Sequence, residues 1–283
     1  MSDLAQIVIR PAADEPALLC HAWLAVVQTV SRRVLLPGSL IVIILGSWEL
    51  AVRISHVSTL LIVPPSAIWT TLIDTASVLG PQAMPTLIDT CVGFALACCI
   101  GFTLGTMVVL SHRLHQALYP HVVLFQLVPK VALAPLFVIW LGVGPSSRLV
   151  FALFLAFFPV VIGTSAGLLS ADRNAVRLCR SLGGSRLQVL FAVQLPYATP
   201  HIFAALKMAV TMAMIGVIVG EFITAQQGLG YIIMFASSAG ETALVFAAIA
   251  LLCLIGVLLY GVVELAEFLV TRRLGVTITS SEF

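Results

Sequence analysis

Three charged features stand out in a chain whose side chains are mostly apolar. Lys130 follows Pro129 inside an apolar run, and Glu221 ends another apolar run shortly before the segment QQGLG at 226–230. Residues 174–196 (NAVRLCRSLGGSRLQVLFAVQLP) gather three arginines and a Gly-Gly pair. A lysine in an apolar medium can attract an anion or form an ion pair. A basic, partly apolar segment can rest on anionic lipid headgroups or dock onto a protein partner.

Other chemistry has little support in the sequence. The six histidines are scattered, and no HxxxH or Cys/His cluster indicates a metal site. The two lysines, Lys130 and Lys207, do not belong to a GxxxxGK[ST] phosphate loop. We therefore expect no enzyme activity in this chain, no catalytic residue, no metal ligand and no cofactor of its own.

The composition is that of an integral membrane protein with an all-α fold. Only 9% of the 283 residues are charged and 60% are hydrophobic, with a mean hydropathy of +1.13. Soluble domains carry about 25% charged residues, so this chain has too few to cover a globular surface. Four of the six cysteines fall within apolar runs, which favours free thiols over disulfides.

Apolar runs of about 20 residues can cross the hydrocarbon core as helices. Two shorter segments, 17–30 and 66–79, are expected to be helices lying at opposite membrane interfaces. Six predicted spans cover 34–52, 84–110, 117–141, 147–169, 203–223 and 243–270.

Six spans place both termini on one side of the membrane, and most of the positive charges lie on that same side. That side holds eleven of the fourteen Lys and Arg residues, Lys207 among them, whereas the other keeps only Arg53 and Arg148, and Lys130 lies within a span. This asymmetry predicts that both termini are cytoplasmic.

Small residues and carboxylates within the spans allow further expectations. Three GxxxG spacings, which begin at Gly101, Gly163 and Gly216, permit close helix packing. Several carboxylates near span ends are expected to face water or headgroups: Glu49, Asp89, Glu264 and Glu267.

The largest predicted cytoplasmic loop runs from 170 to 201. We expect a helix over 173–182, a break at Gly183-Gly184, and a second helix over 186–194 with Ser185 as its N-cap. Pro196 is expected to stop this second helix. From the residues alone, a helix resting on headgroups and a docking element for a protein remain two open interpretations.

The loop resembles the signature loop of ABC-importer permeases, in which Glu-Ala-Ala precedes a glycine and a later Ile-x-Leu-Pro. Gly183 and the Leu195-Pro196 pair fit this spacing, Val193 replaces the isoleucine, and Arg-Leu-Cys at 177–179 replaces Glu-Ala-Ala. In that family the helix before the glycine docks onto a separate ATPase subunit. The resemblance thus implies these coupling residues: Arg177, Leu178, Cys179, Arg180, Ser181, Leu182, Gly183, Gly184 and Pro196.

The resemblance extends over about residues 60–272. The stretches LIVPPS (61–66), PKVALAPLFVIWLGVG (129–144) and GEFITAQQGLGYII (220–233) are similar to the nitrate/sulfonate/taurine branch of these permeases. The family implies a type I ABC-importer permease-like bundle in the bacterial inner membrane. Its implied partners are a second copy of the permease, two ATP-binding subunits that hold ATP and Mg, and an extracytoplasmic substrate-binding protein. Lipid surrounds it, and nucleic acid is not involved.

These expectations divide the chain into a cytoplasmic segment (1–33), a six-span permease domain (34–272) and a cytoplasmic tail (273–283). Within the permease domain, Pro129, Lys130 and Glu221 are candidates for the translocation path or its gate. Lys130 could instead form a structural ion pair, and Glu221 could be an interfacial anchor. A lysine in the path favours an anionic solute, such as a sulfonate, nitrate or bicarbonate, although pyrimidine-type compounds also fit. The alternative to an importer subunit is a stand-alone secondary transporter or channel.

Overall fold

The computed structural model describes residues 36, 38–55, 58, 61–224 and 226–274. The predicted helix at 17–30 and the predicted tail beyond residue 274 lie outside this part. Every regular element within it is helical, which confirms the all-α prediction. The chain forms two compact units, residues 1–66 and 67–283.

The first unit contains a helix over Gly38–Ser55, in agreement with the predicted span at 34–52. Near its end, the Glu49 carboxylate forms an ion pair with Arg53 (2.6 Å). The same carboxylate accepts hydrogen bonds from the Ser66 backbone N–H (3.0 Å) and hydroxyl (2.8 Å). Ser66 lies in the first turn of α2 (Pro65–Asp74). Glu49 therefore holds Ser66 beside the end of the Gly38–Ser55 helix within the first unit.

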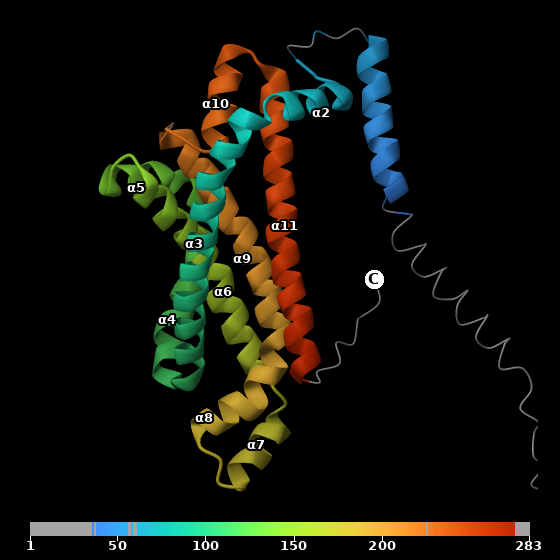
Figure 1. Ribbon diagram of the computed structural model, residues 1–283. Helices are drawn as coiled ribbons and strands as arrows, with labels where there is room; N and C mark the ends of the chain where they lie inside the picture. Colours follow the sequence, from blue (N-terminus) through green and yellow to red (C-terminus); the bar gives the residue numbers. More distant parts are fainter. Residues whose placement is uncertain (1–35, 37, 56–57, 59–60, 225, 275–283) are drawn as a thin grey trace, which may run out of the picture. The chain divides into compact units, whose positions relative to one another are not determined.

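The second unit is a bundle of long helices. α6 packs along α3 and α9, and α11 lies beside α9 (Figure 1). At about 1.5 Å per residue, each is long enough to cross a bilayer. The bounds are Ala76–Leu110 for α3, Pro145–Leu169 for α6, Leu195–Thr224 for α9 and Thr242–Leu274 for α11.

These helices confirm the predicted spans at 84–110, 147–169, 203–223 and 243–270, with two shifted boundaries. α3 begins at Ala76, so the predicted interfacial helix at 66–79 is wrong in its last residues, because α2 ends at Asp74. α9 begins before residue 203, and its start belongs to the loop described below.

Glycines set the spacing of the central helices. A Cβ on Gly163 of α6 would lie 2.2 Å from the Ala205 Cβ of α9, and one on Gly101 of α3 would lie 2.8 Å from the Val160 Cβ of α6. The neighbours of Gly216 are equally close, since its Cβ would lie 2.6 Å from the Ala152 Cα. All three GxxxG spacings, which the sequence showed only to permit close packing, therefore lie at packed interfaces.

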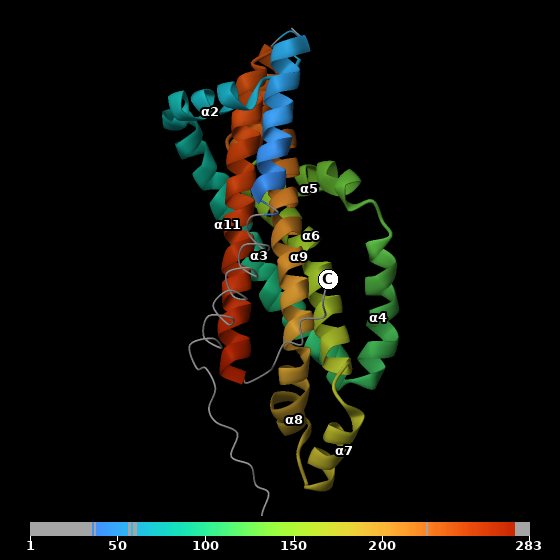
Figure 2. The same cartoon turned by 90° about the vertical axis from the view of Figure 1, so that its right-hand side faces the viewer.

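The predicted third span at 117–141 is broken. α4 (His112–Gln126) is followed by a 3₁₀ turn, η1 (Lys130–Leu133), and by α5 (Ala134–Leu141), and the two arms meet at 92° (Figure 2). The apolar run at 117–141 is therefore interrupted beside Lys130. The cause is Pro129 and Pro135, because each lacks the N–H that a continuous helix requires.

A short apolar helix, α10 (Leu229–Ala239), was not predicted. Its 11 residues extend only about 16 Å, too little to cross the hydrocarbon core. It begins after Gly228 and ends at Gly240, and both glycines have positive φ angles (103° and 74°). The helix lies against α9 and α11.

The outer surface of the described bundle is apolar where it would face lipid. On α11, for example, Val257, Leu258 and Leu265 are exposed. The five described cysteines are free thiols, as predicted. Within the described residues, five helices are long and apolar enough to cross a membrane, and the bent α4–α5 pair brings the number to six if it is counted as one span.

Candidate functional site

The loop predicted at 170–201 consists of two short helices. The Asp172 carboxylate accepts a hydrogen bond from the Asn174 N–H (3.0 Å) and begins α7 (Arg173–Ser181). Ser185 begins α8 (Arg186–Val189) with a capping box, in which Ser185 and Gln188 each accept the other's backbone N–H. The predicted helices and N-cap are confirmed.

Each glycine of the Gly-Gly pair between these helices is favoured for a different physical reason. Gly183 has a φ of +83°, a conformation that costs side-chain-bearing residues about 1–2 kcal/mol. Gly184 donates its N–H to the Cys179 carbonyl (3.0 Å), and a Cβ there would lie 2.7 Å from that oxygen. Both positions therefore favour glycine.

The predicted stop at Pro196 is wrong. A π-helical turn, η2 (Leu190–Gln194), follows α8 and leads directly into α9, so one helical segment runs from Arg186 to Thr224. The wider turn accommodates a proline that lacks an N–H at the second residue of α9. The loop is therefore joined to the span without a hinge.

The loop exposes apolar as well as basic side chains. Leu178 and Leu182 are 62% and 80% exposed, and Leu187 and Phe191 are exposed to similar degrees. α7 and α8 extend past the ends of α3 and α11 in both views (Figures 1 and 2). The result is an apolar and basic surface at one end of the bundle.

Lys130 lies at the corner of the broken span. Its Nζ is 4.9 Å from the centre of the Phe158 ring on α6, a cation–π geometry. Pro129, just before it, is exposed and precedes the turn. Lys130 forms no ion pair with a described carboxylate. The structural ion pair that the sequence left open is therefore not found in the described part of the chain.

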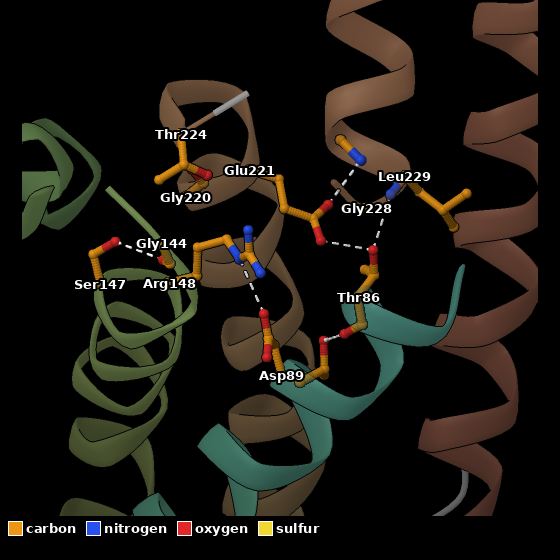
Figure 3. Close-up of polar contacts among 12 residues, drawn as sticks. Thr86, Asp89, Gly144, Ser147, Arg148, Gly220, Glu221, Thr224, Gly228 and Leu229 are labelled. Atoms are coloured by element: carbon orange, nitrogen blue, oxygen red, sulfur yellow. Dashed lines mark hydrogen bonds and ion pairs between the residues drawn. The ribbon is translucent and has the colours of Figure 1, made fainter. Parts of the chain in front are cut away.

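Glu221 lies elsewhere, in a buried polar cluster at the start of α10 (Figure 3). Its carboxylate accepts hydrogen bonds from the Thr86 hydroxyl (2.7 Å) and from the Gly230 N–H (2.7 Å). The Thr86 hydroxyl in turn accepts the Leu229 N–H (2.9 Å).

The side chains around Glu221 satisfy the first backbone donors of α10, which have no partner within the helix. A carboxylate at a helix N-terminus is also favoured by the helix dipole. A Cβ on Gly228 would lie 2.0 Å from the Glu221 carboxylate, so that position requires glycine. Glu221 is therefore an internal cap and not an interfacial anchor.

An ion pair between Asp89 of α3 and Arg148 of α6 adjoins this cluster. The Arg148 Nε lies 3.0 Å from the Asp89 carboxylate, and the two residues are 0% and 8% exposed. Figure 3 shows the guanidinium between Asp89 and Glu221. Gly220 makes room for it, because a Cβ there would lie 2.9 Å from the Arg148 Cγ.

These contacts correct two sequence predictions. Asp89 was expected to face water or headgroups, but it is buried together with Arg148. Glu267, also expected at a headgroup, forms an ion pair of 2.8 Å with Lys207 between α11 and α9. The only signal in the sequence was a charge of each sign inside apolar runs, which does not say which charges pair.

Comparisons with known proteins agree with this architecture. Residues 97–272 match the family described as "Binding-protein-dependent transport system inner membrane component". A chain in a structure of the MetNI methionine ABC transporter in inward-facing conformations superposes with a TM-score of 0.60 at 19% identity, over 71% of this chain and 98% of that one. The fold is thus that of an ABC-importer permease subunit.

Curated relatives extend the match over most of the chain. The formylaminopyrimidine transport permease protein ThiX of Halalkalibacterium halodurans is 30% identical over 84% of this chain and 95% of its own length. The taurine transport system permease protein TauC of Escherichia coli is 30% identical over 87% of this chain and 90% of its own. The chain belongs to the inner membrane components of binding-protein-dependent transport systems, the permease subunits of ABC importers.

The buried ion pair leads to a prediction about stability. Asp89→Asn leaves the Arg148 charge buried without its partner, which costs about 3–5 kcal/mol. We expect a clearly lower thermal unfolding midpoint in detergent for Asp89→Asn. The double variant Asp89→Leu/Arg148→Met removes both charges and is expected to regain part of that loss. Glu264→Gln, at an exposed carboxylate on α11, serves as the control, and a wild-type midpoint for Asp89→Asn would contradict the role of the pair.

Proposed function

We propose that this chain forms the solute path of an ATP-driven importer and is coupled to a separate ATPase through residues 170–201. The observation that carries this proposal is the exposed apolar and basic surface of α7 and α8. This surface combines exposed leucines with exposed arginines, and α8 continues directly into α9. Such a mixed surface suits a groove on a protein partner.

The coupling residues on this surface are those from Arg177 to Gly184, and Pro196 lies where the loop joins α9. Two permease copies would bind two ATP-binding subunits, which supply ATP and Mg and carry out hydrolysis. A substrate-binding protein would deliver solute at the other end of the bundle. Closure of the ATPase pair on ATP would then shift the permease between two conformations through these contacts.

We further propose that the protein lies in the bacterial inner membrane with both termini in the cytoplasm. The arginines of α7 and α8, Arg113 at the start of α4, and Arg272 and Arg273 at the end of α11 all lie at one end of the bundle (Figure 1). This asymmetry supports the orientation, since positively charged segments remain on the cytoplasmic side.

The solute path is proposed to pass Pro129 and Lys130, with Glu221 near its gate. An ammonium group that has no carboxylate partner in the described chain favours a small anion, such as a sulfonate, nitrate or bicarbonate. The relative named for taurine transport fits a sulfonate. The relative named for formylaminopyrimidine transport keeps pyrimidine-type solutes as a candidate.

A substitution at the inter-helix turn tests the coupling. Gly183→Val places a β-branched residue at a φ of +83° and should distort the turn between α7 and α8. We expect solute uptake by reconstituted transporter to fall at least about tenfold, because a 1.4 kcal/mol change suffices for that factor. Membrane insertion should be unchanged.

Gly240→Val is the matched control, because Gly240 also has a positive φ (74°), with no atom within 4 Å of an added Cβ. The Gly240→Val variant should have similar backbone strain, but its solute uptake and its uptake per ATP hydrolysed should equal those of the wild type. Normal coupled uptake by Gly183→Val would count against the docking role of the loop.

A second test concerns the lysine in the path. Lys130→Ala removes a charge-assisted contact worth about 1.5–3 kcal/mol, so half-maximal uptake of an anionic solute should require about tenfold more solute or more. Lys130→Arg should restore uptake because it keeps the charge. Unchanged kinetics and solute preference in Lys130→Ala would show that the side chain does not line the path.

A further inference from the structure

A cavity of about 710 Å³ opens beside the loop, where two long helices end. Leu110, the last residue of α3, and Leu169, the last of α6, both line it. Val109 and Val189 complete its apolar lining. The cavity therefore lies where two membrane-spanning segments reach their boundary.

The polar part of the lining is cationic or neutral. It comprises His112 and His115 of α4, Arg180 and Arg186 of the loop, and Gln194 and Gly184. No carboxylate of the described residues lines the cavity. The lining thus combines two full positive charges with two imidazoles beside an apolar surface.

The two arginines are available to a ligand. No described carboxylate lies within 4 Å of Arg180 or Arg186. Arg186 is held in place by a hydrogen bond from its Nη1 to the Leu110 carbonyl (3.4 Å). Its other guanidinium N–H groups form none of the hydrogen bonds found in the described chain. A guanidinium fork matches the geometry of a phosphate group.

The start of α4 adds to the positive potential. Ser111 caps this 15-residue helix by accepting the Leu114 N–H (3.4 Å), and His112 is its first residue. A helix N-terminus favours anions. Gln194 is fixed beside the cavity by a hydrogen bond to the Leu168 carbonyl (3.2 Å), and the His115 ring stacks on Tyr119.

We propose that this cavity is a binding site for a phosphate-bearing anion, with the phosphate held by Arg180, Arg186 and the first turn of α4. The apolar residues at the ends of α3 and α6 favour an anionic phospholipid, whose headgroup would bind the arginines while its chains follow the helices. A soluble phosphate would use the same donors without the apolar contacts. The site is distinct from the solute path at Lys130, and it shares Arg180 and Gly184 with the proposed docking surface.

The test uses the full-length chain, delipidated in detergent, and follows thermal unfolding as ligand is added. The probes are dioleoylphosphatidylglycerol, the zwitterionic dioleoylphosphatidylcholine, and inorganic phosphate. A ligand that binds only the folded state raises the unfolding midpoint, which gives its affinity. We expect tighter binding of phosphatidylglycerol than of phosphatidylcholine. Arg186→Gln should weaken phosphatidylglycerol binding by about tenfold, as the loss of one charge-assisted contact predicts.

Arg173→Gln is the matched control, because Arg173 is an exposed residue of α7 that does not line the cavity, and the lipid affinity of this variant should equal that of the wild type. If inorganic phosphate binds and competes with the lipid, the site stands and its natural ligand is a soluble phosphate. Equal binding by wild type and Arg186→Gln, or no preference for phosphatidylglycerol together with no effect of phosphate, would overturn the proposal.

A second measurement keeps the test valid if Arg186→Gln does not fold. A photoreactive phosphatidylglycerol should label the wild-type chain in peptides 109–115 and 180–194. Labelling confined to other segments would overturn the proposal. His115→Glu, which places a carboxylate in the lining, should reduce the labelling of both peptides.

Discussion

The structure depends on one constraint: inside a bilayer, buried backbone donors and charges must find their partners within the protein. α10 begins inside the bundle, so its first N–H groups cannot be left to water. Thr86 and Glu221 accept two of them, and Gln82 accepts the Gly228 N–H (2.8 Å). The Asp89 carboxylate forms an ion pair with the Arg148 guanidinium between α3 and α6. Four helices are thereby fixed around one polar cluster.

This cluster explains the arrangement of the apolar parts as well. Gly216 lets α9 approach the α6 backbone closely, and Gly220 leaves space for the Arg148 side chain between the two helices. The same α9 continues through the π-helical turn into α8, so one helical segment joins the loop at one end to Glu221 near the other. A force applied at α7 and α8 would therefore act on a helix whose far end contacts the start of α10. This connection gives the proposed coupling a physical path.

Much of this fold could be predicted from the sequence, and the failures have physical causes. Apolar run length found the long helices, and Gly183-Gly184 with Ser185 placed the break and the second helix start, because these signals are local. Pro196 was mistaken for the end of a helix. The π-helical turn before it lets the helix continue through a proline, and no local sequence pattern predicts such a turn. The Asp89–Arg148 pair was missed because its members lie 59 residues apart, and only the packing of α3 against α6 brings them together. α10 was missed because its apolar run is too short to be told from a loop segment.

The central claim is that α7 and α8 dock onto a separate ATPase. The most direct measurement is to co-express this chain with a candidate ATPase subunit, purify the product in nanodiscs, and determine the subunit stoichiometry and the ATP turnover. The account predicts a complex of two permease and two ATPase chains, whose ATP turnover falls when residues 177–186 are altered. A chain that purifies alone, binds no ATPase and still moves solute down an ion gradient would contradict it and would indicate a stand-alone secondary transporter.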